Sequence, residues 1–269
     1  MAEDMMKEVA KEIAKKAYED GGKAVLKPTG ELAGLVPRAI RAALLPVEKW
    51  ILSREYNLEA TKKMLDEKLE KVPAELIQSP EPFIAVPAIQ YISYCMDNDE
   101  LRDMYANLLA NSMNAIIKNG VHPAFVEIIK QLSPDEAKLL RHVYQAGTIP
   151  AIDICFRNEA GSGFTIYKNF SNIGNTAGCE NPDNISSYFD NLIRLGLLQQ
   201  SSALSSLTNK ELYEPLKKDP FVEKYQDKIE NDGETYNRRC EEGFIRITAF
   251  GKLFGDICLQ EPSSIVAQA

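Results

Sequence analysis

The stretch SPDEAKLLRHVYQAG, residues 133–147, decides the fold of the C-terminal half of the chain. Ser133 is a favourable helix N-cap, Pro134 suits the first helical position, and Glu136 completes a capping box. Apolar residues then recur at helical spacing until Gly147, which is typical of a helix end. The sequence therefore predicts a helix here, and we expect a new domain to begin at Ser133.

Downstream of this helix the apolar spacing changes to that of a strand. Ile152, Ile154 and Phe156 alternate, which predicts a β-strand. Residues 157–184 are rich in Gly, Ser and Asn, so we expect a long, partly irregular connection. Residues 185–195 then carry an apolar face at helical spacing and predict a further helix.

The remaining elements suggest a winged helix. The run LIRLGLL, residues 192–198, leads from a helix into a strand, and Thr248 is placed to cap a last helix. Between them, the charged segment 201–242 is far longer than an ordinary wing, and we expect it to contain one or two helices. This order predicts a winged-helix-like α+β domain with an enlarged wing over residues 133–260, followed by a flexible tail at 261–269.

The part before Ser133 is predicted to be helical, so the fold class expected for the whole chain is mainly α. Residues 53–132 form the predicted helical domain, with Asn57 as an N-cap and 79–87 as an irregular link. The four helices expected in it span residues 57–72, 88–96, 101–113 and 121–132.

Residues 1–52 read as a separate N-terminal amphipathic helical segment. Residues 5–18 carry a narrow apolar stripe, and residues 21–50 are net basic and contain three prolines. We favour packing of this segment on its own domain, with another subunit or the surface of an anionic membrane as alternatives for residues 5–50. Neither a signal peptide nor a transmembrane helix is predicted.

The charge balance makes nucleic-acid binding a minority hypothesis. The chain has 31 Lys and Arg against 39 Asp and Glu, and the part from Leu132 onward has 14 basic and 19 acidic residues. Phosphate contacts, if made, are expected from Arg194, Arg238, Arg239 and Arg246. A winged helix that contacts protein fits these charges better.

No pattern of catalytic or metal-binding residues stands out. The five cysteines are scattered, which predicts reduced thiols in a cytosol, and the two histidines lie in no catalytic motif. A metal site built from cysteines and His142, or from Asp97, Asp99 and Asp103, is a weak alternative. We therefore expect no cofactor, no metal and no enzymatic activity. The residues involved in the first alternative are Cys155, Cys179, Cys240 and Cys258.

Three asparagines, Asn107, Asn111 and Asn114, follow one side of the predicted helix at 101–113. Amide side chains at this spacing can bond a neighbouring helix or a ligand, and bonding between helices is the commoner use.

Three stretches resemble one bacterial family. EYNLEATKKMLDEKLEKVP (55–73), LRDMYANLLANSMN (101–114) and VHPAFVEIIKQLSPDEAKLL (121–140) are similar to the abortive-infection alpha family, Abi-alpha. The resemblance implies a role in defence against phage, in which infected cells stop growing or die before phage is released. The matched residues offered as candidates for a shared surface or a shared core are Tyr105, Asn107, Asn111, His122, Pro123 and Phe125.

The leading hypothesis is a non-enzymatic, cytoplasmic defence protein that binds a protein partner or self-associates. The alternatives are a winged-helix regulator that binds DNA, and an effector that acts on the inner membrane through its N-terminal segment.

Overall fold

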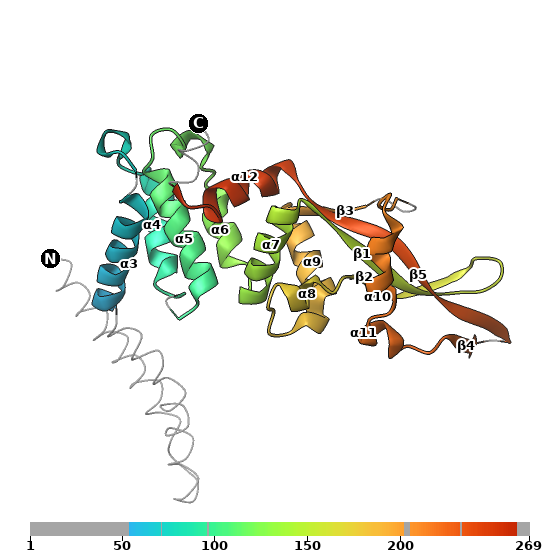
Figure 1. The fold of residues 1–269 in the computed structure, drawn as a ribbon. Coiled ribbons are helices and arrows are strands. Elements are labelled where there is room, and N and C mark those ends of the chain that lie inside the picture. Colours follow the sequence, from blue (N-terminus) through green and yellow to red (C-terminus); the bar gives the residue numbers. More distant parts are fainter. Residues whose placement is uncertain (1–53, 71, 96, 202–204, 232, 263–269) are drawn as a thin grey trace, which may run out of the picture. The chain divides into compact units, whose positions relative to one another are not determined.

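A computed structural model describes residues 54–70, 72–95, 97–201, 205–231 and 233–262 (Figure 1). The chain divides into two compact units, Met1–Tyr56 and Asn57–Ala269, and the contacts reported below lie within the second. The predictions made for segment 1–52 and for most of the tail at 261–269 fall outside the described residues. The predicted domain boundary at Ser133 stays a prediction.

The N-terminal part of the second unit is helical, as expected. Its α-helices are α3 (Arg54–Leu69), α4 (Pro82–Ile92), α5 (Asp99–Ser112), α6 (Ala124–Lys130) and α7 (Pro134–Ala146). The prediction that Asn57 caps the first of these helices is wrong, because α3 already includes Asn57. The residues before it, Arg54 and Glu55, are better helix formers than Asn, so the helix continues through them.

The helix predicted at 88–96 is present with other bounds, because α4 begins at Pro82 and contains Pro87, so the irregular link predicted at 79–87 is wrong from Pro82 onward. Proline is well suited to the first helical turn, where its missing N–H has no partner in any case. Pro87 removes the hydrogen bond to the carbonyl of Phe83, but Phe83 is exposed, so water can satisfy that carbonyl. Exposure at Phe83 therefore makes the second proline tolerable.

The two best-marked helices form as predicted. In α5, the Asn98 side chain accepts a hydrogen bond from the Leu101 N–H at 2.9 Å. In α7, Ser133 Oγ accepts from the Glu136 N–H at 3.3 Å and Glu136 Oε2 accepts from the Ser133 N–H at 2.6 Å, which confirms the capping box. Gly147 follows with φ of +73°, a conformation that glycine adopts without strain.

An antiparallel sheet follows α7, so the described residues form a mixed α+β structure rather than a mainly α one. The order is β2-β1-β5-β3, and β4 also pairs with β5. The strands are β1 (Thr148–Arg157), β2 (Gly163–Phe170), β3 (Leu198–Gln200), β4 (Lys228–Asn231) and β5 (Glu234–Ile247).

Strand β2 corrects the expected irregular connection at 157–184. It pairs with β1 from Arg157↔Gly163 to Ile152↔Phe170, with register shifts near Ile154. The segment GFTIYKNF does alternate, but the glycines and asparagines around it hid this strand. The rest of the connection holds α8 (Ile173–Thr176), and the predicted helix at 185–195 is present as α9 (Ile185–Arg194).

The long charged segment 201–242 contains helices, as predicted. Between β3 and β4 lie a 3-10 turn at Lys210–Tyr213, α10 (Glu214–Lys217) and α11 (Pro220–Glu223). Tyr213 and Leu216 from this segment are buried in the core of the second unit. The insertion is therefore packed onto the sheet.

The last helix, α12 (Ala249–Cys258), returns from the sheet to the helical part (Figure 1). Thr248 caps it by accepting from the Gly251 N–H at 2.8 Å. Its apolar face joins one continuous hydrophobic core that extends from α4 to β5. None of the helices that the structure describes is long and apolar enough to cross a membrane.

Candidate functional site

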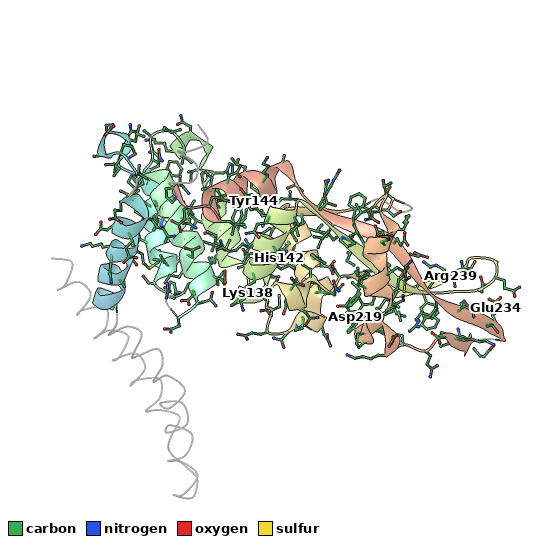
Figure 2. All side chains as sticks on the ribbon, viewed as in Figure 1. Lys138, His142, Tyr144, Asp219, Glu234 and Arg239 are labelled. Carbon is green, nitrogen blue, oxygen red and sulfur yellow. The ribbon has the colours of Figure 1, made fainter. Side chains whose placement is uncertain are left out.

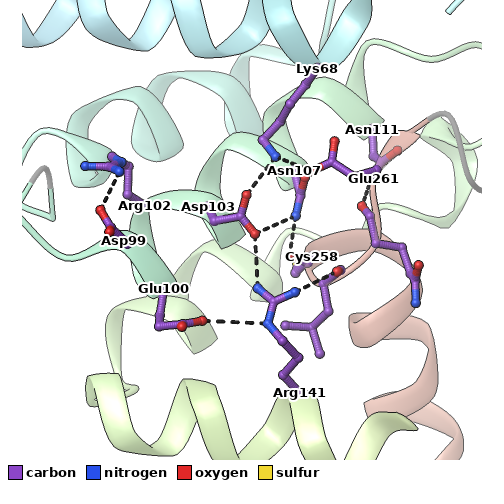
Figure 3. Close-up of polar contacts among 12 residues, drawn as sticks. Lys68, Asp99, Glu100, Arg102, Asp103, Asn107, Asn111, Arg141, Cys258 and Glu261 are labelled. Atoms are coloured by element: carbon purple, nitrogen blue, oxygen red, sulfur yellow. Dashed lines mark hydrogen bonds and ion pairs between the residues drawn. The ribbon is translucent and has the colours of Figure 1, made fainter. Parts of the chain in front are cut away.

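The asparagines of α5 bond the C-terminal end of α12 (Figure 3). Asn107 Nδ2 donates to the Cys258 carbonyl at 3.2 Å, and Asn111 Nδ2 donates to the Ile257 carbonyl at 2.8 Å. The last carbonyls of a helix have no partner within the helix, so these amides satisfy groups that would otherwise be buried without one. The prediction of bonding between helices is thus confirmed for Asn107 and Asn111.

Beside these amides lies an ion-pair cluster formed by Lys68, Glu100, Asp103, Arg141 and Glu261, which we call the Asp103 cluster (Figure 3). The Asp103 carboxylate accepts hydrogen bonds from Lys68 Nζ at 2.7 Å and from Arg141 Nη2 at 3.0 Å. Arg141 Nη1 also donates to the Leu259 carbonyl at 3.1 Å. The cluster therefore ties α3, α5 and α7 to the residues after α12.

The chemistry of the Asp103 cluster is that of a structural junction. Each of its three carboxylates faces a cationic side chain, and each cation faces a carboxylate. A general base needs a lone pair directed at substrate, and a nucleophile needs an activating neighbour. The contacts of the cluster instead hold helices together.

The other residues singled out from the family resemblance divide into two buried and two exposed side chains. Tyr105 and Phe125 are fully buried, and the Tyr105 hydroxyl donates to the Val126 carbonyl at 3.2 Å. Burial raises the pKa of Tyr105 well above its usual value. His122 and Pro123 are exposed, and His122 Nδ1 accepts from the Ala124 N–H at 3.1 Å at the start of α6.

Of the two readings left open for these candidates, a shared surface or a shared core, burial favours the core for Tyr105, Asn107, Asn111 and Phe125. Direct contact of any of them with a partner stays a prediction.

The four candidate arginines do not gather into one basic surface. Arg238 is held by the Val222 and Tyr225 carbonyls at 2.7 and 2.6 Å and by Asp227. Arg194 bonds Gln131 and Asn191 on the helical side.

Arg239 and Arg246 are both exposed, but they lie seven residues apart on β5 and so point to opposite faces of the sheet. Arg239 lies on the outer part of β5, away from His142 on α7 (Figure 2). Phosphate binding by these arginines stays a prediction that their placement does not favour.

Burial disfavours ionisation of the cysteine thiols. Burial raises the pKa of Cys179 to about 11 and raises the pKa of Cys95, Cys240 and Cys258. Burial also raises the pKa of Cys155. Within the described ranges, no group of three or more His, Cys, Asp or Glu side chains could hold a metal ion.

A pocket of about 520 Å³, with polar and apolar lining in equal parts, lies on the sheet. At its edge Asn169, with φ of +54°, donates from Nδ2 to Gln200 Oε1 at 3.0 Å, and its N–H donates to Asp153 Oδ1 at 2.7 Å. These bonds connect β2 at one edge of the sheet to β3 at the other. Asn169, in the left-handed conformation that asparagine tolerates, thus links the two edges of the sheet.

The most unusual surface is one that sequence analysis missed. Helix α4, PFIAVPAIQYI, has no charged residue, and it buries Ile84, Ala85, Ala88 and Ile92 against its neighbours. Its opposite side exposes Phe83, Val86 and Ile89, with 60% and 64% of the first two accessible; we call these three residues the α4 face.

An apolar pocket of about 290 Å³ lies at the C-terminal end of α4. Its walls are almost entirely apolar or aromatic, apart from Lys130, whose ammonium donates to the Tyr91 hydroxyl at 2.8 Å. The lining residues are Tyr91, Tyr94, Cys95, Leu101, Tyr105, Ile129 and Lys130. A sequence signal existed, since Gln90 is the one side chain of IAVPAIQYI that is neither apolar nor aromatic, but Pro87 was read as a helix boundary.

The fold and the contacts above define a mixed α+β protein with a polar structural junction and an exposed apolar helix face. Residues 53–258 match the family model described as "Abortive infection alpha", so the chain belongs to that family. This membership suggests a role in abortive-infection defence.

Two further comparisons add little. No curated protein matches the sequence. One solved structure, of an uncharacterized protein from the hydrocarbon-degrading marine bacterium Alcanivorax borkumensis SK2, is 21% identical over 51% of this chain and 92% of that chain. Its TM-score is 0.37, a likeness too weak to support an argument about fold or function.

Proposed function

We propose that this protein is a non-enzymatic component of abortive-infection defence that acts through protein contacts of its helical part. The observation that carries the proposal is the α4 face. A helix that is apolar on all sides is normally buried, and an exposed apolar patch commonly marks a contact surface. Because Phe83 and Val86 are exposed in this chain, another protein surface is the simplest cover for them.

The other residues with chemical potential support binding rather than catalysis. The pKa values of all five thiols are raised, so little reactive thiolate forms near neutral pH. The carboxylates of the Asp103 cluster are engaged in ion pairs that hold helices together.

We interpret residues 133–260 as a winged-helix domain with an enlarged wing. The order α7, β1, α9, β3, β5, α12 and the sheet path β1-β5-β3 support this interpretation, with β2, α10 and α11 as additions. The exposed side of α9 carries Ser187 and Asp190, and its one basic residue is Arg194. This domain therefore suits protein contacts better than phosphate backbones.

DNA binding by the winged helix is the first alternative, through Arg194, Arg238, Arg239 and Arg246. Retention of duplex DNA by the full chain at low salt, lost on replacing these arginines and falling steeply with added salt, supports the alternative. Negligible retention at low salt removes it.

The second alternative is that the protein acts on a membrane through residues 5–50. Leakage of anionic vesicles on adding the full chain supports it, and intact vesicles at every protein concentration count against it.

The decisive experiment challenges bacteria that express the full chain with phage. Val86→Asp places a charge on the α4 face, whereas Leu212→Asp places one on another exposed apolar side chain, 44% accessible, in the segment between β3 and β4. Both variants should fold, because both side chains are exposed.

We expect loss of protection for Val86→Asp and retention for Leu212→Asp. Equal protection by both variants, at equal protein levels, contradicts the proposal.

A further inference from the structure

The pocket of about 520 Å³ on the sheet gathers polar residues from three strands around Asn169. Lys168 precedes Asn169 on β2, and the Asn169 N–H donates to Asp153 Oδ1 on β1 at 2.7 Å. The Asn169 side chain donates from Nδ2 to Gln200 Oε1 on β3 at 3.0 Å. All four residues line the pocket, so Asn169 brings the other three to one site.

Each of these residues keeps one hydrogen-bonding group that no described residue engages. Asn169 is only 9% exposed, yet its Oδ1 accepts no hydrogen bond within the described ranges. Buried polar atoms are nearly always paired, so an open acceptor beside a pocket indicates a partner from outside the chain. Asp153 Oδ2 is a second open acceptor, while Lys168 Nζ and Gln200 Nε2 are open donors.

The open groups include one charge of each sign. In the part of the chain that the structure describes, neither Asp153 nor Lys168 forms an ion pair. In contrast, Glu242 of the same lining pairs with Lys210 at 2.7 Å and with Lys217 at 2.9 Å. One carboxylate and one ammonium are therefore left to be balanced.

The register of the sheet adds a cost at Asp153 that the described residues do not remove. Strands β1 and β5 place Asp153 directly opposite Glu241, and like charges in this position repel each other. Arg157 offsets the repulsion at Glu241, because its Nε donates to Glu241 Oε1 at 2.8 Å. A positively charged group in the pocket would do the same for Asp153.

We propose that this pocket binds a small zwitterion of the amino-acid class, either a free amino acid or a short peptide. The ligand ammonium donates to the Asp153 carboxylate and to Asn169 Oδ1. The ligand carboxylate accepts from Lys168 Nζ and Gln200 Nε2. Charge-assisted hydrogen bonds are roughly twice as strong as neutral ones, so both ends of the ligand contribute. The site does not include the α4 face, so this inference is independent of the proposed function.

The size and lining of the pocket agree with such a ligand. Pockets for small molecules commonly have volumes of about 300–1,000 Å³, a range that includes this one. Its half-polar lining suits a ligand with two polar ends better than an acyl chain. Gly243 also lines the pocket, and a Cβ atom there would lie 2.8 Å from Ser201 Oγ, so a side chain at this position would crowd the site.

Ligands of a single charge fit this lining less well. A simple anion would meet one ammonium but three carboxylates, those of Asp153, Glu241 and Glu242. A simple cation would balance Asp153 but would leave Lys168 unpaired beside it. A zwitterion balances both charges.

Isothermal titration calorimetry of the full chain tests the inference, with the free L-amino acids and diglycine as probes. We expect at least one probe to bind at a single saturable site. Its amide, which lacks the carboxylate, and its N-acetyl form, which lacks the ammonium, should each bind about tenfold more weakly, because each loses charge-assisted hydrogen bonds. Tighter binding of diglycine than of every free amino acid supports a peptide source, and the reverse order supports a free amino acid. No binding of any probe at millimolar concentration overturns the inference.

Two variants test whether the bound probe occupies this pocket. Asp153→Asn keeps an acceptor for the Asn169 N–H, and Lys168 is exposed, so Asp153→Asn and Lys168→Gln should fold with little change in Tm. Each should weaken binding of the best probe about tenfold. The controls Asp190→Asn on α9 and Lys252→Gln on α12, both at exposed positions, should leave binding unchanged.

Three results overturn the inference in different ways. Binding that neither Asp153→Asn nor Lys168→Gln weakens shows that the probe binds elsewhere. Binding that needs Asp153 but not Lys168, and that the amide probe reproduces, shows a site for a simple cation. Binding that needs Lys168 alone, and that the N-acetyl probe reproduces, shows a site for a simple anion.

Discussion

Gly251 on α12 lies where the helix crosses the chain just before β3, and replacing it tests how tightly that crossing is packed. A Cβ atom at this position lies 2.0 Å from the Leu197 carbonyl oxygen and 2.8 Å from its carbon. Both neighbours are backbone atoms, so neither can move aside by rotating a side chain. Gly251→Ala therefore forces α12 away from the strand.

The expected cost follows from two opposing effects. Overpacking a core costs about 1–3 kcal/mol, and these backbone contacts favour the upper part of that range. Alanine offsets up to about 1 kcal/mol, because it is a better helix former than glycine. We expect a net loss of about 2 kcal/mol in the free energy of unfolding, or a fall of about 5 °C in Tm for a chain of this size.

Urea unfolding followed by circular dichroism measures the loss, and Gly120→Ala is the matched control. A Cβ atom on Gly120 meets only Leu253 Cδ1 at 3.7 Å, an ordinary contact, so this variant should match the wild type. If Gly251→Ala is as stable as Gly120→Ala, the close approach of α12 to Leu197 is refuted.

Three further predictions concern the polar contacts. Burial tends to raise the pKa of Asp135, but hydrogen bonds from the Glu180 and Asn181 N–H groups and the Tyr188 hydroxyl hold it below its usual value. Its stabilisation is then fully present above the usual Asp range and lost as pH falls through the lowered pKa. In urea titrations the wild type should therefore exceed Asp135→Asn most at neutral pH and lose this advantage in acid; a constant difference contradicts this. Asn111→Asp replaces the amide that donates to the Ile257 carbonyl with an acceptor, so it should lower the free energy of unfolding in urea by about 1–3 kcal/mol. The control Asn231→Asp, at an exposed position, should lower it little. Arg141→Gln should lower Tm by a few degrees, because it leaves the Leu259 carbonyl and Asp103 with fewer donors, and an unchanged Tm argues against the junction.

Sequence patterns predicted the elements whose determinants are local. The capping box of α7 depends on Ser133 and Glu136, three positions apart, so it could be read directly. Strand β2 was missed because its stability comes from pairing with β1 and not from its own glycine-rich surroundings. The first half of α4 was missed because the cost of Pro87 depends on whether the Phe83 carbonyl reaches water.

The candidate site depended still more on contacts between distant residues. The asparagine spacing on α5 suggested a bonding partner, but that partner, the end of α12, lies about 150 residues later in the chain. Likewise, the sequence made Arg238 a candidate for phosphate contact, but its guanidinium donates hydrogen bonds to the Val222 and Tyr225 carbonyls. Periodicity shows which side of a helix is apolar, but it cannot show whether that side is covered.

The most direct test of the central claim is phage protection by a graded series at one position, Val86→Leu, Val86→Asn and Val86→Asp. At equal protein levels and unchanged Tm, protection should be kept by the leucine variant, reduced by the asparagine variant and lost in the aspartate variant, because the contact depends on the apolar α4 face. Undiminished protection by all three folded variants contradicts the claim that this protein acts through that face.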